Sequence, residues 1–297
     1  MRFSIWPSSA HSWDEILTMA RNAESTGWDG VYVADHFMPN SDDVGGPMQE
    51  ALSVLAGLAA AVPRVRLASL VFGNTYRHPA VLAKAAVTID HISGGRFVLG
   101  LGAGWQENEH DAYGIELRDV GPRLKQFAEA VRIVRSLRDE PRTTLHGDFY
   151  DVTDAPLEPK PVGPMPILIG GGGERVMLRI VAELADEWNI WSTPERMSEK
   201  AEVLARHCEA VERDPATIQR STQALLFPGP EGAATAEKFA EIRPAIGGTS
   251  EQLVDTVGQY AELGVDELIV PDFTLGEPTS AMAVYDQLIT EVAPPFR

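Results

Sequence analysis

Short runs of apolar and β-branched residues alternate with stretches of helical hydrophobic period along the whole chain. The runs that predict strands are Arg2–Trp6, Gly30–Ala34, Val65–Val71, Arg96–Leu101, Met165–Ile169, Glu187–Trp191, Thr222–Phe227 and Glu267–Val270. The stretches that predict helices are Trp13–Thr26, Met48–Val62, Ala80–Ile92, Gly121–Arg138, Glu174–Ala185, Pro194–Arg213, Ser250–Leu263 and Thr279–Val292. Eight strands, each followed by a helix, predict an α/β fold, a parallel (β/α)8 barrel of the TIM-barrel type.

The length and the absence of any shift in composition predict one domain over residues 1–297. Barrels of this type form single domains of about 250 residues. One segment departs from the strand–helix alternation, because the sequence from Thr143 to Val152 has His146, Gly147 and Asp148 at its centre. Alternating residues around such a turn predict a small hairpin at residues 143–152, inserted into the barrel.

The formal net charge is −18, from 43 acidic and 25 basic residues. Such a surface repels polyanions, so we expect neither a nucleic acid nor a membrane as partner. No apolar run reaches the roughly 18 residues of a membrane span, and the N-terminal residues predict a strand rather than a signal peptide. We therefore expect a cytoplasmic protein. The single cysteine, Cys208, excludes a disulfide within the chain.

Catalytic groups of a barrel enzyme lie at the C-terminal ends of its strands, and the second predicted strand ends in Asp35 and His36. A histidine can gain or lose a proton near neutral pH, which makes His36 a candidate acid or base. The alternative is that Asp35 caps a turn and His36 only packs. Position alone favours neither interpretation.

The third and fourth strands carry small residues near their ends. Ser69 interrupts an apolar run, which indicates a local irregularity in the third strand. Gly100, Gly102 and Gly104 alternate after the fourth strand, and such glycines let a flat ligand approach the backbone. Their spacing is not that of the dinucleotide-binding fingerprint.

Four glycines, Gly170 to Gly173, stand between the fifth predicted strand and its helix. They expose backbone N–H groups at the positive end of the helix dipole, which predicts a site for phosphate. Arg175 adds a positive charge there. The loop lacks the Lys-Ser/Thr pair of NTPases, so nucleotide hydrolysis is disfavoured. A merely flexible loop is the alternative.

The seven histidines show neither HxH nor HExxH spacing, so the sequence predicts no metal site and disfavours a metal-dependent hydrolase. No GxSxG motif is present either. These exclusions leave a site for a phosphate-bearing, planar cofactor with a histidine beside it.

Several motifs together resemble the luciferase-like monooxygenase superfamily, and within it the branch that depends on the deazaflavin coenzyme F420. They are Thr75–Pro79, Asp90–Arg96, Gly100–Trp105, Gly248–Leu253 and Leu263–Pro271. The resemblance covers nearly the whole chain. It implies an F420-dependent oxidoreductase that transfers a hydride between C5 of the deazaflavin and a small organic substrate. It also implies a homodimer.

The resemblance assigns roles to individual positions. Asp35 would contact the deazaflavin, and His36 would lie near its reactive centre. A non-prolyl cis peptide bond in the family's third strand would fall at Ser69–Leu70. The remaining cofactor contacts would come from Ala103, Gly104 and Asn108 at the ring and tail, and from Gly172, Gly173, Arg175 and Val176 at the phosphate.

Two positions depart from the sugar-phosphate dehydrogenases of this family. Trp105 stands where those enzymes have a catalytic glutamate, and Trp191 stands near a substrate-contacting threonine. Both indicate a flatter or more apolar substrate, although Trp191 can equally serve in core packing. Two other functions stay open at this point: an FMN-dependent monooxygenase on the same fold, and a non-catalytic protein that binds F420 or flavin.

Overall fold

The computed structural model describes residues 1–297 and contains a closed barrel of eight parallel strands with helices around it. Around the barrel the strands follow in the order β1 (Arg2–Trp6), β2 (Gly30–Val33), β3 (Arg66–Ser69), β5 (Phe97–Gly102), β8 (Ile167–Gly170), β9 (Glu187–Trp191), β10 (Gln219–Gln223) and β13 (Glu267–Pro271). Pairing of β13 with β1 and of β3 with β5 closes the ring. The predicted fold is confirmed.

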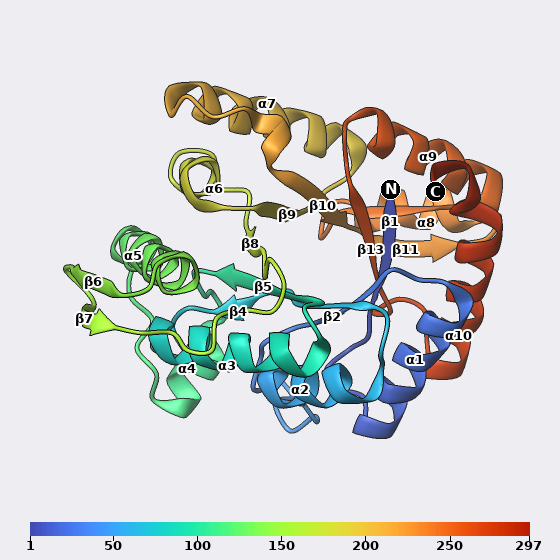
Figure 1. Ribbon diagram of the computed structural model, residues 1–297. Coiled ribbons are helices and arrows are strands. Elements are labelled where there is room, and N and C mark those ends of the chain that lie inside the picture. The colour runs from blue at the N-terminus through green and yellow to red at the C-terminus, as the bar shows by residue number, and fades with distance from the viewer.

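The main helices cover the outside of the barrel (Figure 1). They are α1 (Trp13–Thr26), α2 (Ala51–Ala61), α3 (Pro79–Ser93), α5 (Val120–Asp139), α6 (Met177–Leu184), α7 (Pro194–Ala210), α9 (Ser250–Glu262) and α10 (Pro278–Gln287). The chain also forms a π-helical turn (Leu288–Val292) and two short 3-10 turns (Pro215–Thr217 and Pro294–Phe296). The two termini lie together, and the Met1 amino group donates to Phe296 O over 2.6 Å. None of these helices combines the length and the apolar composition that a membrane crossing requires.

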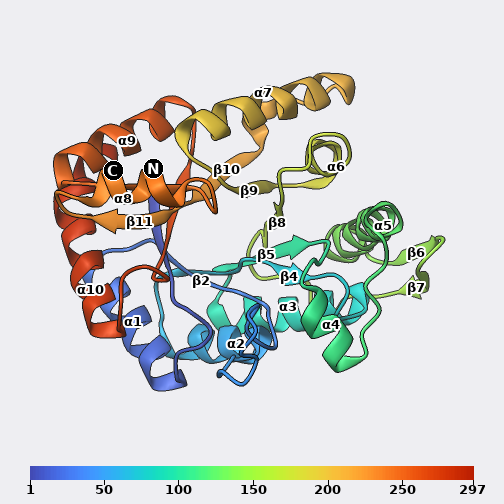
Figure 2. The ribbon, with the colours of Figure 1, turned by 180° about the vertical axis from the view of Figure 1, so that it is seen from behind.

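The seventh barrel strand differs from the prediction. The strand expected at Thr222–Phe227 is divided: β10 ends at Gln223, and β11 (Leu225–Pro228) pairs with β12 (Ala245–Gly248) in a separate sheet. The apolar run misled the prediction because the inward residues of β10 are polar. Asn189 on β9 donates to Ser221 Oγ at 3.0 Å and to Gln223 Oε1 at 2.7 Å. Together β11, α8 (Gly232–Phe239) and β12 form an insertion beside the barrel (Figure 2).

The predicted hairpin is present. β6 (Thr143–His146) and β7 (Asp151–Ala155) pair antiparallel and lie beside α5, away from the barrel axis (Figures 1 and 2). The Glu129 carboxylate of α5 accepts three backbone N–H bonds from the turn, at 2.7 to 3.1 Å. This carboxylate fixes the hairpin to the barrel's helical layer.

Ion pairs fill the N-terminal end of the barrel. The Arg66 guanidinium lies 2.6 Å from Glu187 Oε1 and 2.5 Å from Glu267 Oε2, and Ser4 Oγ donates to Glu267 Oε1 at 2.5 Å. Burial raises the pKa of Glu187, although Arg66 acts in the opposite direction. A buried charge requires such a partner, because an unpaired one is strongly destabilising. This network occupies the N-terminal end of the barrel interior.

Candidate active site

An irregularity divides the third barrel strand where it reaches the C-terminal end of the barrel. After β3 the chain resumes pairing with β5 as β4 (Phe72–Gly73), one residue out of register with the first pairing. The residues between them contain a non-prolyl cis peptide bond at Leu70–Val71. The predicted irregularity is therefore present, but its cis bond was placed one residue too early, at Ser69–Leu70.

Glycines on the neighbouring strands make room for this bulge. A Cβ on Gly100 would lie 2.0 Å from the backbone oxygen of Ser69, and one on Gly102 would lie 2.6 Å from Val71 Cγ2. A Cβ on Gly170 would lie 3.0 Å from Val71 Cγ1. Ser69 also fastens the bulge to β5, since its Oγ donates to Gly100 O and accepts from Gly100 N. Two of the alternating glycines are thus required by the bulge itself.

His36 lies after β2 with one ring nitrogen held by a buried carboxylate. Its Nδ1 is 2.8 Å from Oε1 of Glu109, which lies in α4 (Glu107–Tyr113). The same carboxylate accepts from Phe37 N at 2.7 Å and from the Tyr76 hydroxyl. The Glu109 side chain is fully buried, whereas a quarter of the His36 side chain is exposed.

Glu109 remains ionised in this environment. Burial alone would raise its pKa, but the bonds from His36, Phe37 N and Tyr76 outweigh burial and hold the pKa below its ordinary value. Burial and the neighbouring carboxylate raise the pKa of the Tyr76 hydroxyl, which stays a donor. An ionised acceptor on Nδ1 places the proton of a neutral imidazole there, so Nε2 carries the lone pair and makes no hydrogen bond within the chain.

Asp35 is buried behind His36 and is bound to Arg77. Arg77 Nη1 and Nη2 lie 2.7 and 2.9 Å from its two oxygens, and Gly73 N donates to it at 3.0 Å. Arg77 also reaches Glu50 at 2.6 Å. Burial raises the pKa of Asp35, although Arg77 acts against this effect. The arrangement fixes β2 against the bulge, and contact between Asp35 and a cofactor stays a prediction.

The glycine loop after β8 presents free backbone donors. Gly171 N donates to Asn189 O, but no backbone N–H from Gly172 to Val176 donates a hydrogen bond within the chain. The helix begins at Met177 rather than at the predicted Glu174, so Arg175 precedes the first turn. Lys200 pairs with the Glu174 carboxylate at 2.5 Å, whereas Arg175 is exposed and has no ion pair. Five free N–H groups and one free cation suit a phosphate.

The other predicted cofactor residues occupy the loop between β5 and α4. Gly104 has a left-handed φ of 82°, and a Cβ there would lie 2.7 Å from Thr75 Oγ1. Ala103 is half-buried beside it. Asn108 donates to Pro39 O at 3.0 Å, while its Oδ1 is buried without a partner. This orphaned acceptor leaves Asn108 with one hydrogen bond to make.

The two predicted substrate residues lie on the same face of the barrel. Trp105 is 53% exposed, and its ring centroid lies 5.5 Å from that of His36. Trp191, at the end of β9, contacts the rings of Trp6 and Phe273. The structure therefore brings Trp105 to His36 and places Trp191 in a separate aromatic cluster.

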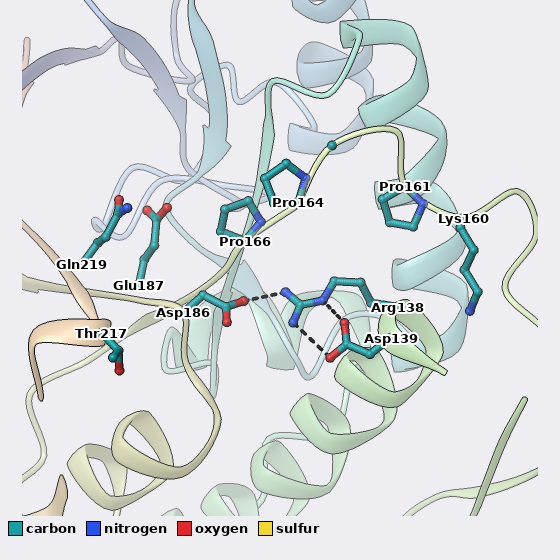
Figure 3. Close-up of a pocket in the computed structure, with 11 residues that line it drawn as sticks. Arg138, Asp139, Lys160, Pro161, Pro164, Pro166, Asp186, Glu187, Thr217 and Gln219 are labelled. Carbon is teal, nitrogen blue, oxygen red and sulfur yellow. Dashed lines mark hydrogen bonds and ion pairs between the residues drawn. The ribbon is translucent and has the colours of Figure 1, made fainter. Parts of the chain in front are cut away.

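A cavity of about 520 Å³ opens at the other end of the barrel (Figure 3). It is lined by residues at the starts of the strands, among them Glu187 and Gln219. Figure 3 shows Arg138 between Asp139 and Asp186, paired with both carboxylates. Its charged groups all have partners within the chain, since Lys160 donates to backbone carbonyls and Glu187 pairs with Arg66. Barrel enzymes place their chemistry at the opposite face. We assign this cavity no part in the site.

The model of the family described as luciferase-like monooxygenase matches residues 1–265. Curated relatives include the F420-dependent glucose-6-phosphate dehydrogenases of Kineococcus radiotolerans, 36% identical over 163 residues, and of Amycolatopsis mediterranei, 33% identical over 160 residues. Each alignment covers 54% of this chain and 48% of the relative, so the chain spans about half the length of the curated relatives it matches.

Two solved structures with similar folds are an F420-dependent secondary alcohol dehydrogenase with an F420–acetone adduct and the F420-dependent tetrahydromethanopterin reductase of Methanopyrus kandleri. The first has a TM-score of 0.84 at 18% identity and aligns over 98% of this chain and 99% of its own. The second has a TM-score of 0.82 at 17% identity, over 100% and 99% of the two chains. At these identities the likeness concerns the fold.

Proposed function

Because the chain belongs to the luciferase-like monooxygenase family, we propose that it is an oxidoreductase that uses coenzyme F420 to exchange a hydride with a small organic substrate. The observation that carries the proposal is the loop from Gly172 to Val176, with its five free backbone donors, on the same face of the barrel as His36. The names of the aligned relatives favour F420 over FMN.

The residues at this face fit a phosphate-bearing ring system. Gly172, Gly173, Val176 N and the Arg175 side chain would hold the phosphate, and the Leu70–Val71 bulge would support the ring. Ala103, Gly104 and Asn108 would contact the ring and tail, and the buried, unpartnered Oδ1 of Asn108 supports a polar contact there. When bound, F420 supplies a hydride-carrying C5.

His36 performs the accompanying proton transfer in this mechanism. Nδ1 is held by Glu109, so the free Nε2 takes up or gives the proton that the substrate exchanges. The ionised Glu109 stabilises the imidazolium form whenever Nε2 is protonated, as a buried carboxylate does for a catalytic histidine. Trp105, whose ring lies edge-on to that of His36, would cover one side of the imidazole.

The two large replacements noted in the sequence, Trp105 and Trp191, support a flatter or more apolar substrate than a phosphorylated sugar. Exposed apolar side chains also occur on loops that follow barrel strands: Val44, Trp105, Val176 and Phe273. Burial of such groups by an apolar substrate is favourable by about 25 cal/mol for each Å².

A cofactor titration tests the proposal. Purified protein is titrated separately with F420 and FMN while tryptophan fluorescence is followed, and oxidation of reduced F420 is then measured over a panel of carbonyl and alkene substrates. We expect F420 to bind and FMN to bind much more weakly. Binding of FMN alone would favour the monooxygenase, and F420 binding without turnover of any substrate would favour a carrier protein. The homodimer, single-domain and cytoplasmic assignments remain predictions, and light scattering checks the first.

A further inference from the structure

An aromatic cluster lies at the C-terminal ends of three barrel strands, on the same face of the barrel as His36. Trp6 ends β1, Trp191 ends β9, and Phe273 follows β13. The ring centroids are 5.6 Å apart for Trp6 and Trp191, 5.0 Å for Trp6 and Phe273, and 6.4 Å for Trp191 and Phe273. Trp6 is buried, whereas Phe273 is 43% exposed. The cluster therefore has a buried part, Trp6, and an exposed ring, Phe273, at the C-terminal end of the barrel.

An arginine from the insertion covers one part of this cluster. Arg243 lies between α8 and β12, and its Cζ is 4.7 Å from the centroid of the Trp191 ring. The insertion contacts the barrel through β11, which lies beside β13 (Figure 1). It is joined to the Phe273 loop, because Thr274 Oγ1 donates to Leu226 O at 2.7 Å. Arg243 and the aromatic cluster are thus parts of one surface.

The Arg243 side chain makes no ion pair and no hydrogen bond within the chain, although the net charge of the protein is −18. A guanidinium that stacks on an aromatic ring uses its face for that contact, and its N–H groups point outward in its plane. Those groups match the two oxygens of a carboxylate. Arg77 at the same face differs, because its donors are bound to Asp35 and Glu50.

We propose that this surface binds the carboxylate of a planar, conjugated substrate, with the ring against Phe273 and Trp191 and the carboxylate on Arg243. The proposal names the substrate class of the oxidoreductase site and rests on that proposed function, while the binding itself requires no cofactor. A planar acid uses both features of the surface, whereas a neutral planar molecule uses only the rings and a saturated acid only the cation.

Calorimetric titration of the purified protein with three probes tests this assignment. The probes are 2-naphthoate, its neutral amide 2-naphthamide, and cyclohexanecarboxylate. We expect 2-naphthoate to bind at least about tenfold more tightly than either of the others. Equal affinities for naphthoate and naphthamide, or no binding of naphthoate, would overturn the proposal.

Variants distinguish the contribution of the Arg243 charge to binding from that of the aromatic rings. Arg243→Gln is expected to weaken naphthoate binding about tenfold and to leave naphthamide binding within about twofold. Arg243→Lys keeps the charge without the planar fork and should give an intermediate affinity. Phe273→Leu should weaken both planar probes. Lys238→Gln on α8 removes the same charge from the same insertion and serves as the matched control.

Unchanged naphthoate binding by Arg243→Gln, or equal weakening by Lys238→Gln, would contradict the assignment. Both side chains are exposed, so neither change endangers the fold, and thermal unfolding checks this. The outcome is separate from that of the proposed function. A protein that binds the probes but does not turn over F420 would support the carboxylate-binding surface and contradict the proposed function. A protein that turns over F420 but does not bind the probes would contradict the carboxylate-binding surface only.

Discussion

Replacement of Glu109 by glutamine removes one charge from beneath His36 while it keeps the size of the side chain. The wild-type carboxylate lies 2.8 Å from His36 Nδ1 and 2.7 Å from Phe37 N, and it also accepts from Tyr76. An amide has only one accepting oxygen, so its NH2 group must face one side of this arrangement. The change therefore either leaves a buried donor without a partner or forces His36 into the tautomer whose Nδ1 accepts.

The magnitude follows from these contacts. A hydrogen bond to a charged group contributes about 1.5–3 kcal/mol, and an orphaned buried donor carries a further desolvation cost, so we expect a loss of about 3 kcal/mol in stability. Loss of the fixed Nδ1–H tautomer and of the charge that stabilises the imidazolium should lower kcat about 100-fold, within the usual contribution of acid–base catalysis.

Oxidation of reduced F420 is followed by absorbance across a pH series, with unfolding in urea measured in parallel. The matched control is Glu107→Gln, an exposed residue on the same helix. We expect the Glu109→Gln variant to have a KM close to that of the wild type and a displaced pH profile. A variant with wild-type kcat and an unchanged pH profile would refute the assigned role of Glu109, whatever its stability.

Three further changes test the surrounding structure. Gly100→Ala places a Cβ 2.0 Å from the backbone oxygen of the bulge and should cost about 3 kcal/mol in urea unfolding, whereas Gly121→Ala, with no atom within 4 Å, should not destabilise the protein. Arg77→Met leaves Asp35 buried without its partner and should cost about 3–5 kcal/mol, part of which the added change Asp35→Asn should restore. The lowered pKa of Glu109 contributes stability above its ordinary value of 4.5 that is lost as the pH falls through the lower folded value, so below pH 4.5 the unfolding free energy should fall more steeply in the wild type than in Glu109→Gln.

The barrel could be predicted because its strands and helices have clear hydrophobic periods. The prediction failed at β10, whose inward Ser221 and Gln223 bond to Asn189 and so break the apolar pattern of a buried strand. The insertion that carries Arg243 was also missed, because β11 was merged with β10. Local period cannot identify a strand whose inner face is satisfied by hydrogen bonds.

The candidate site was only partly visible in the sequence. Glycines indicated the loop proposed to bind phosphate because their backbone freedom is a local property, and the position after β2 indicated His36. Glu109 was missed, since nothing near residue 109 indicates that the fold brings its carboxylate to His36, 73 positions away. The sequence shows only an acidic residue in the helix that follows Gly100, Gly102 and Gly104. The contact of Glu109 with His36 depends on the tertiary structure.

A crystal structure of the protein with F420 bound would show where the cofactor lies. We expect its phosphate within about 3 Å of backbone N–H groups between Gly172 and Val176, with the ring against the Leu70–Val71 bulge and its reactive edge facing His36. A phosphate bound elsewhere on the barrel, or a ring that lies away from His36, would contradict this expectation.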